Sequence, residues 1–338
     1  MIITIHDVAK KAGVSIATVS RVINNNYPVK PETKEKIYKA INELGYVPNE
    51  TARSLILKSS STIGIIVPGI TNLFFPTIVE EINRVLMNYG YTMSLYSTEG
   101  NSDVEKRVIA SIISNNMGGI IAIDPSIENL DNGYFHEVSK KIPMIIINAN
   151  TDRDDCNFIS YDEEVGTKEA FQYLANLGHT KISFLRGDRS LSYDLKERIY
   201  KDFLKEGKLE FENIVNVGMG NSIEVIENTE NICEELLKNQ NLGTAVFACN
   251  DLMAVGVVNA CTKLNLRVPQ HLSVIGFDNT LLSNINHPRI TTVDLKMKTI
   301  GHDSAMQIIE MIKRKSKKFD KKIYETRLVI RDSCVKAN

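Results

Sequence analysis

Apolar residues in the first 45 positions of the chain recur with the period of short helices. One apolar face comprises Ile5, Val8, Ala9 and Ala12, and the next comprises Val14, Val19, Val22 and Ile23. Thr4 has an acidic residue three positions later, which is the pattern of a capping box, and Ser15 offers an N-cap to the second helix. Gly13 can adopt the left-handed conformation that ends a helix. Pro31 opens a third helical pattern over residues 31–44, so the sequence predicts three short helices around a small core.

From residue 62 onward, short apolar runs alternate with amphipathic helical stretches. The predicted strands lie within residues 62–69, 92–98, 118–124, 143–149, 181–187, 214–218, 244–250 and 273–279. The predicted helices cover residues 77–89, 103–115, 165–176, 223–238 and 252–264, with one more ending at 206. Strands that are apolar throughout and alternate with helices are typical of parallel α/β sheets. About two hundred residues of this pattern exceed one compact sheet, so we expect two similar lobes that divide near residue 160.

These changes of pattern predict three parts of the chain. They are an all-α head at residues 1–47, a short helix and linker at 48–61, and an α/β core at 62–338. A late helix and strand, at 300–312 and 324–330, suggest that the chain crosses between the lobes again. The N-lobe is therefore expected at about 62–160 plus 292–322, and the C-lobe at about 161–291 plus 323–332. An isolated helix as short as residues 50–57 is marginal in water, so we expect it to fold only when a partner orders it.

The distribution of charge points to a polyanionic partner for the head. The chain has 338 residues, of which 43% are hydrophobic and 24% charged, an ordinary globular balance, and its net charge is -1. Residues 1–60 hold nine Lys or Arg against five acids, so this segment carries +4 and the remainder -5. A basic head on an acidic body favours binding to a polyanion such as nucleic acid.

Cysteine use and hydropathy exclude several other classes of protein. The five cysteines are widely scattered and have no histidine at ligand spacing, so we expect free thiols, no structural zinc and no other metal or cofactor. No apolar run approaches the length of a membrane span, and the opening MIITIHDVAKK lacks a secretory leader. The expected location is the cytoplasm.

Polar and aromatic side chains follow the predicted strands. They include Thr71, Asn72, Phe74, Phe75, Ser97, Thr98, Asp124, Asn148, Asn150, Arg186, Asp188, Arg189, Asn250, Asp251, Asp278 and Asn279. Ligands of open α/β sheets bind beyond the carboxyl ends of the strands, so two facing lobes would enclose a cleft for a small polar or polyhydroxylated ligand. The pairs at 250–251 and 278–279 also stand where helix N-caps belong, and both interpretations remain open.

The helix pair of the head has the spacing of a DNA-binding helix-turn-helix, but an ordinary helical hairpin shares this spacing. Seven segments along the whole chain favour the DNA-binding interpretation. They are TIHDVAKKAGVSIATVSRVIN, LGYVPNETARSL, IGIIVPGITNLFF, LGHTKISFL, ACNDLMAVG, LRVPQHLSVIGFDN and ITTV. With these segments in order, the chain resembles the lactose-repressor (LacI/GalR) family of bacterial transcription regulators over essentially its whole length. The resemblance implies a repressor that binds near-palindromic operator DNA as a homodimer. It also implies a periplasmic-binding-protein-like core of two doubly wound parallel-sheet lobes, with a small effector, commonly a sugar, in the cleft.

The resemblance places the DNA contacts in the head and in the linker that follows it. Ile16, Ala17 and Arg21 occupy the base-reading positions, and arginine is the residue that can pair with guanine through two hydrogen bonds. Leu55 matches the hinge-helix leucine that enters the minor groove. The residues expected to contact phosphate are Ser15, Thr18, Ser20, Asn24 and Tyr46. The full set is Thr4, Ser15, Ile16, Ala17, Thr18, Ser20, Arg21, Asn24, Tyr46 and Leu55.

In the cleft, the resemblance points to six effector-binding residues. They are Asn72, Phe75, Asn148, Arg198, Asn250 and Asp278. An arginine and an aspartate can hold adjacent hydroxyl groups, and amides can read the others. The sequence departs from the family pattern at several places, including DLKM after ITTV, where glutamine and proline are common, and Leu73, where proline is frequent. The segment KERIYKDFLKEG lacks the glycine and aromatic pair that usually follows the arginine, and Gly220 stands where many relatives carry an aromatic residue.

We expect the chain not to be an enzyme. It has no dinucleotide fingerprint or Walker A motif, and His179 precedes a strand, away from the predicted cleft. Two alternative functions remain. A solute-binding receptor would share the core but would have no use for the basic head. The similarity of SIATVSRV to Gram-positive catabolite-control regulators also allows control by a phosphoprotein corepressor that docks on the core.

Overall fold

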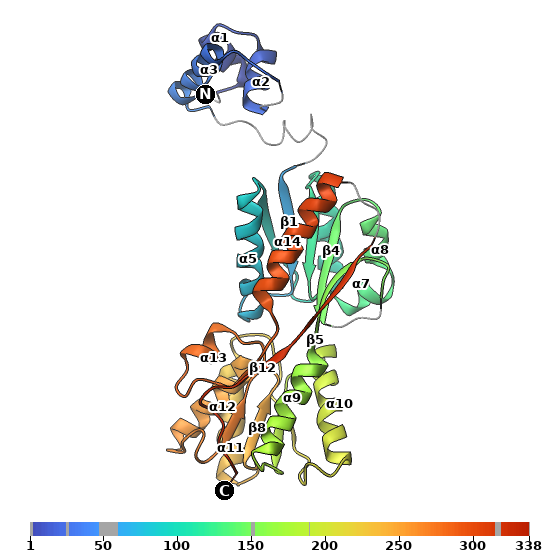
Figure 1. The fold of residues 1–338 in the computed structure, drawn as a ribbon, viewed down its shortest axis with the longest axis vertical. Coiled ribbons are helices and arrows are strands. Elements are labelled where there is room, and N and C mark those ends of the chain that lie inside the picture. The colour runs from blue at the N-terminus through green and yellow to red at the C-terminus, as the bar shows by residue number, and fades with distance from the viewer. Residues whose placement is uncertain are drawn as a thin grey trace. The chain divides into compact units, whose positions relative to one another are not determined.

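The computed structural model describes residues 3–24, 27–46, 60–149, 153–188, 190–314 and 319–337. At Asn24, Asn148 and Ala149 it describes the backbone alone. The chain divides into two compact units, residues 1–60 and 61–338 (Figure 1). The expected linker helix, including Leu55, lies outside the described residues. None of the described helices is long and apolar enough to cross a membrane.

The smaller unit contains the three helices that the periodicity predicts. They are α1 (Ile5–Ala12), α2 (Ile16–Asn24) and α3 (Pro31–Leu44). Thr4 and Asp7 cap α1, since the backbone N–H and the hydroxyl of Thr4 donate to the Asp7 carboxylate at 2.9 and 2.7 Å. Gly13 ends the helix with φ of 66°. Val8, Val19 and Ile37, one from each helix, are fully buried where the helices meet.

The larger unit contains two parallel sheets and a two-stranded ribbon. The six-stranded sheet has the order β11-β5-β4-β3-β1-β2, and the four-stranded sheet has the order β7-β6-β8-β9. The first comprises β1 (Thr62–Val67), β2 (Thr92–Ser97), β3 (Gly119–Ile123), β4 (Met144–Ala149), β5 (Asn157–Asp162) and β11 (Lys321–Glu325). The second comprises β6 (Ile182–Arg186), β7 (Ile214–Asn216), β8 (Ala245–Ala248) and β9 (Ser273–Ile275), and the antiparallel ribbon pairs β10 (Thr292–Asp294) with β12 (Arg327–Val329). Each parallel sheet is the centre of one lobe.

Helices cover both faces of each parallel sheet. The N-lobe has α5 (Phe74–Asn88), α6 (Ser102–Ser114), α7 (Ile127–Asp131), α8 (Tyr134–Ser139) and α14 (Met297–Arg314). The C-lobe has α9 (Glu163–Asn176), α10 (Leu191–Lys205), α11 (Val225–Lys238), α12 (Asp251–Lys263) and α13 (Leu281–Ile285). Along β1, Ile65 and Val67 pack in the cluster that contains α5 and α14, whereas Ile66 packs in the cluster of α6 to α8. Strand residues apolar on both faces are thus explained by two layers of helices.

The chain passes between the lobes three times, and the structure corrects the predicted elements at these crossings. The apolar segment β5, absent from the predicted strands, carries the first crossing into α9 (Figure 1). The expected single strand at 324–330 is two strands, because β11 pairs with β5 in the N-lobe and β12 pairs with β10. Thr326 between them accepts a hydrogen bond from Gly166 N at 2.9 Å and donates to Asp162 O at 2.6 Å. The last crossing is therefore tied to the first.

His179 has the structural role expected from its position before a strand. Its ring is buried, with Nδ1 2.9 Å from Thr244 Oγ1 and Nε2 2.9 Å from Val335 O. Burial lowers the pKa of this imidazole, so its neutral form joins the carboxyl-terminal segment to the C-lobe. The histidine does not line the cleft described below.

A side chain at Gly301 should loosen the contact between α14 and α5. A Cβ atom at this position would lie 2.8 Å from Ile78 O and 3.0 Å from Glu81 Cβ. We expect Gly301→Ala to lower the free energy of unfolding by about 1–2 kcal/mol, because the steric cost exceeds the gain in helix propensity. Gly69→Ala is the matched control, since a Cβ there meets nothing within 4 Å. Urea unfolding of both variants tests the contact, and equal stability of the two would contradict it.

Candidate functional site

A cavity of about 910 Å³ lies between the two lobes, at the carboxyl ends of the strands. The N-lobe lines it with the loop after β1 and the start of α5, and with residues that follow β2 and β3. The C-lobe lines it with the ends of β8 and β9, the start of α9 and α10, and the loop at 219–222. This is where an open α/β sheet binds ligands. Among the described residues, no cluster of His, Cys, Asp or Glu could hold a metal ion.

Four of the six expected effector-binding residues line this cavity. They are Asn72, Phe75, Asn250 and Asp278. Asn148 lies at the end of β4, and the structure does not describe its side chain. The expectation for Arg198 is wrong, because this residue is exposed on α10 and does not line the cavity. Lys196, two positions earlier, lines it instead.

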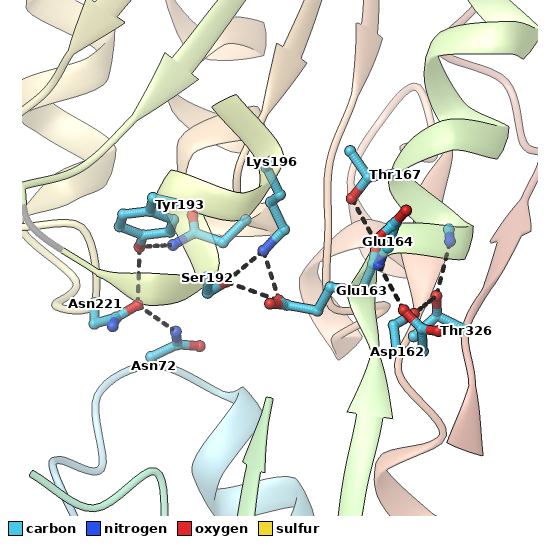
Figure 2. A network of polar contacts seen from close by, with 12 residues as sticks. Asn72, Asp162, Glu163, Glu164, Thr167, Ser192, Tyr193, Lys196, Asn221 and Thr326 are labelled. Carbon is cyan, nitrogen blue, oxygen red and sulfur yellow. Dashed lines mark hydrogen bonds and ion pairs between the residues drawn. The ribbon is translucent and has the colours of Figure 1, made fainter. Parts of the chain in front are cut away.

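Lys196 is the buried cation of the cleft. Its side chain is 1% exposed, and Nζ forms an ion pair with Glu163 Oε1 at 2.7 Å. Nζ also donates to Ser192 Oγ at 2.6 Å and lies 3.8 Å from the centroid of the Phe277 ring. Figure 2 shows Lys196 and Ser192 both directed at the Glu163 carboxylate, to which the serine hydroxyl donates at 2.7 Å. These contacts fix the start of α9 against α10 at the wall of the cavity.

A chain of amide and phenol groups spans the cleft (Figure 2). Asn72 of the N-lobe donates to Asn221 Oδ1 of the C-lobe at 3.2 Å. The same oxygen accepts from the Tyr193 hydroxyl at 3.0 Å, and Tyr193 in turn accepts from Asn250 Nδ2 at 3.3 Å. A polar ligand that takes any of these bonds will therefore change the contact between the lobes.

Asn250 caps a helix and also lines the cavity. Its Oδ1 accepts from Met253 N at 2.9 Å and so caps α12, while Nδ2 donates to Gly220 O at 2.7 Å. Asp251 has a structural role, because its buried carboxylate accepts hydrogen bonds from Thr280 and Thr292. Burial raises the pKa of Asp251 to about 6, and these donors act in the opposite direction.

The surroundings of Gly220 are already occupied by an aromatic ring. A Cβ at Gly220 would lie 2.8 Å from Tyr193 Cε2 and 2.9 Å from Met253 Cε. Tyr193 is 5% exposed and lines the cavity beside Asn221. The aromatic surface of this wall is thus provided by α10, and a larger side chain at position 220 would displace it.

The charge of Glu163 influences two other carboxyl groups of the cleft, those of Asp124 and Asp278. Burial raises the pKa of Asp278 well above its usual range, and the charges of Asp251 and Glu163 contribute. Asp124 is only partly exposed to the cavity, and its pKa is raised to about 6, first by this enclosure and then by the charge of Glu163. Lys196 opposes both shifts. No described residue donates a hydrogen bond to the carboxyl oxygens of Asp124 or Asp278.

The head presents the expected base-reading positions on one exposed helix face. Ile16 is 40% exposed, and Ala17 and Arg21 are also exposed. The Arg21 guanidinium lies 5.1 Å from the centroid of the Tyr27 ring, a contact that orients it. Acidic residues are absent from the first turn of α2. The face is therefore suited to approach DNA.

The other expected DNA-binding residues differ in their surroundings. Ser15 and Thr18 lie on either side of the start of α2, with their hydroxyls 2.8 Å apart, and Ser20 is half-buried. Tyr46 packs against the core of the head, and Thr4 caps α1. Asn24 has no described side chain, and Leu55 lies outside the described residues.

Sequence reasoning missed Lys196, Tyr193, Asn221 and Glu163 as cleft residues. Tyr193 and Lys196 lie three positions apart on one helix, and this spacing is the signal that could have paired them. Asn221 follows the predicted strand at 214–218 by three residues, and this place beyond the end of a strand is the signal that could have identified it.

Comparisons with known proteins agree on the identity of both units. Residues 4–49 match the model of "Bacterial regulatory proteins, lacI family", and residues 171–334 match "Periplasmic binding protein-like domain". Catabolite control protein A of Priestia megaterium is 33% identical over 308 residues, covering 89% of this chain and 90% of that protein. The transcriptional repressor PurR of Vibrio vulnificus strain CMCP6 is 33% identical over 344 residues, covering 99% of each chain. The Lac repressor dimer bound to operator and the anti-inducer ONPF superposes with a TM-score of 0.83 at 25% identity, covering 99% of this chain and 100% of that one.

Removing Lys196 should leave the buried carboxylate of Glu163 without its charged partner. We expect Lys196→Met to lower the free energy of unfolding by about 3–5 kcal/mol, because the Glu163 carboxylate loses its ammonium partner in a site closed to water. The double variant Glu163→Gln with Lys196→Met should recover at least about half of this loss, since neither charge remains. Urea unfolding of the two single variants and the double variant measures the coupling. A loss below about 1 kcal/mol for Lys196→Met would contradict the buried pair.

Asp124 should weaken the fold at alkaline pH and not at acidic pH. Its pKa of about 6 in the folded chain exceeds the ordinary value of 3.8, so its contribution to stability is complete below about pH 4 and is lost as the pH rises through 6. We expect Asp124→Asn to raise the free energy of unfolding by roughly 1–3 kcal/mol at pH 8 and to leave it nearly unchanged at pH 4. Asp154→Asn, at an exposed position, is the control. A pH-independent effect of Asp124→Asn in thermal or urea unfolding would refute this assignment.

Proposed function

Because the chain belongs to the lacI family of bacterial regulatory proteins, we propose that it binds a palindromic operator as a homodimer, represses transcription, and is controlled by a small polar ligand of the sugar class in the cleft of its core. The observation that carries this proposal is the combination of an exposed, acid-free recognition helix with a polar interlobe cavity in one chain. We place the protein in the cytoplasm, where operator DNA is accessible.

The surface of the head supports the proposed contact with DNA. Ile16 and Ala17 can pack against thymine methyl groups, whereas Arg21 can pair with guanine through two hydrogen bonds. The hydroxyls of Ser15 and Thr18 at the start of α2 can donate to phosphate. Most of the hydrogen-bond specificity of the head therefore depends on Arg21, and the remaining specificity is expected from DNA shape and from Leu55 in the linker.

Exposed apolar side chains support the proposed homodimer. Strand β2 forms one edge of the six-stranded sheet, and Leu95 on this strand is 41% exposed. Met87 and Tyr89, at the end of α5 and shortly before β2 in the sequence, are also exposed. Leu281 is exposed in α13. Large exposed apolar residues on an uncovered sheet edge are typical of a protein interface. The Lac repressor that superposes on this chain is a dimer on its operator, which is the arrangement proposed here.

The cleft supplies a physical link between ligand and operator. The bond between Asn72 and Asn221 joins the lobes across the cavity, and its partners Tyr193 and Asn250 face the ligand space. A ligand changes the balance between two arrangements of the lobes only through its difference in affinity for them. In a dimer, a change in the lobes alters the separation of the two heads, and so their fit to successive half-sites.

Arg21→Ala tests the proposed recognition helix. We expect this variant to lose about 1–3 kcal/mol of discrimination between the operator and random DNA, because a bidentate pair with guanine is removed. The operator is first selected from random sequence with the unaltered full chain, and competition binding then compares the variants at one salt concentration. Arg107→Ala, an exposed arginine on α6 in the core, is the control with the same change of charge. Unchanged selectivity of Arg21→Ala would remove α2 from the role of recognition helix.

A further inference from the structure

The cavity between the lobes is lined by a large excess of negative charge. Six carboxylates line it, from Glu99, Asp124, Glu128, Glu163, Asp188 and Asp278. Among the described lining residues, Lys196 is the single cation. With all six carboxyl groups ionised, the described lining carries five net negative charges, in a chain whose net charge is only -1. A cleft lined by one sign of charge concentrates ligands of the opposite sign.

Lys196 is already engaged by the protein. Its Nζ pairs with Glu163 Oε1, donates to Ser192 Oγ, and faces the ring of Phe277. An ammonium group has three protons, and these contacts account for them. A phosphate or carboxylate in the cavity would have to break the pair with Glu163, leaving that carboxylate buried beside a second anion. Arg189 follows Asp188 in the sequence and lies outside the described residues, so the test below includes it.

Several carboxyl oxygens of the cleft, in contrast, receive no hydrogen bond from the described residues. Glu163 is 2% exposed, and its Oε2 has no hydrogen-bond partner among the described residues. Asp124 follows β3 in the N-lobe, and Asp278 follows β9 in the C-lobe, so these acceptors approach the cavity from both lobes. Buried acceptors without donors are costly unless a ligand supplies the donors. A cationic group would supply both protons and charge.

Aromatic rings complete the lining around these acids. Phe74, Phe75, Tyr161 and Tyr193 all line the cavity. Phe74 packs edge-on against Phe75 and against Tyr161, with ring centroids 5.1 and 5.7 Å apart, so this aromatic wall is rigid. The faces of such rings attract cations, and carboxylates with aromatic rings are a common means of binding an organic ammonium group.

We propose that the ligand of the cleft carries a protonated amine on a hydroxyl-bearing frame, as an amino sugar does, and that the cleft rejects phosphorylated and carboxylated sugars. The inference rests on the proposed control of DNA binding by a cleft ligand, and it specifies the chemical class of that ligand. The ammonium group lies beside Asp124 and Asp278, at the wall of the cavity that carries the unpartnered Oε2 of Glu163. Amides of Asn72, Asn221 and Asn250 bind the hydroxyls.

Matched sugars that differ in charge provide the test. Glucosamine, galactosamine and mannosamine are compared with the neutral parent sugars and with the corresponding 6-phosphates and uronic acids. Each sugar, at millimolar concentration, is titrated into the full chain by isothermal titration calorimetry. We expect at least one amino sugar to bind about tenfold or more tightly than its neutral parent, and no anionic sugar to bind. Tighter binding of a neutral or anionic sugar than of its amino counterpart overturns the inference. Absence of binding by every amino sugar overturns it as well.

Variants separate a charge effect from general damage to the cleft. Asp124→Asn combined with Asp278→Asn should reduce the ratio of amino-sugar to neutral-sugar affinity by about tenfold or more, whereas Asp154→Asn at an exposed site should not change it. Arg189→Ala shows whether that residue recruits anions, and anionic sugars that bind the unaltered chain but not this variant count against the proposal. Operator binding by the same preparations tests the regulatory function separately. If the chain binds its operator but prefers neutral sugars, the proposal of a cationic ligand is wrong and the proposed regulatory function stands.

Discussion

The buried ion pair between Glu163 and Lys196 determines how the walls of the cleft are arranged. Glu163 is the first residue of α9, directly after the first crossing between the lobes, and Lys196 lies in the second turn of α10. Both side chains are almost fully buried. Such a pair contributes little net stability, because desolvation of the two charges offsets their attraction. Its main effect is positional, since neither helix can move away from the other without exposing an unpaired charge to an apolar interior.

The same pair leaves the other acids of the cleft uncompensated. Burial raises the pKa values of Asp124 and Asp278, and the charge of Glu163 adds to both shifts, while Lys196, already paired with Glu163, opposes them only in part. Unpaired buried carboxyl groups weaken the empty protein, so their presence is understandable if a ligand supplies the missing charge and donors. The carboxyl groups that would bind a ligand therefore lower the stability of the protein without it, a common trade-off at binding sites.

The connections between the lobes differ in strength, and this difference suits a regulated cleft. At the crossings, Thr326 is buried and bonded to Asp162 and Gly166, while the Asn72 to Asn221 bond across the cavity involves an exposed asparagine. A hydrogen bond open to water contributes little, whereas a buried one is costly to break. A ligand can thus replace the contact across the cleft while the crossings remain intact, and the lobes can change their spacing about a fixed hinge.

The amino-acid sequence alone determined the local elements, because the forces that select them act over a few residues. The cap at Thr4, the left-handed turn at Gly13 and the bounds of α3 follow from such short-range chemistry, and so do most strands of the two lobes. The short crossing strand β5 was missed because its apolar run is brief and interrupted by a serine. Only the tertiary structure placed Lys196 and not Arg198 at the cavity, since residues two positions apart on a helix differ in direction by about 200°. The charge balance of the cleft was likewise a tertiary property. Asp124, Glu163 and Asp278 are far apart in the chain, and Coulomb and desolvation energies depend on separations in space that no sequence pattern specifies.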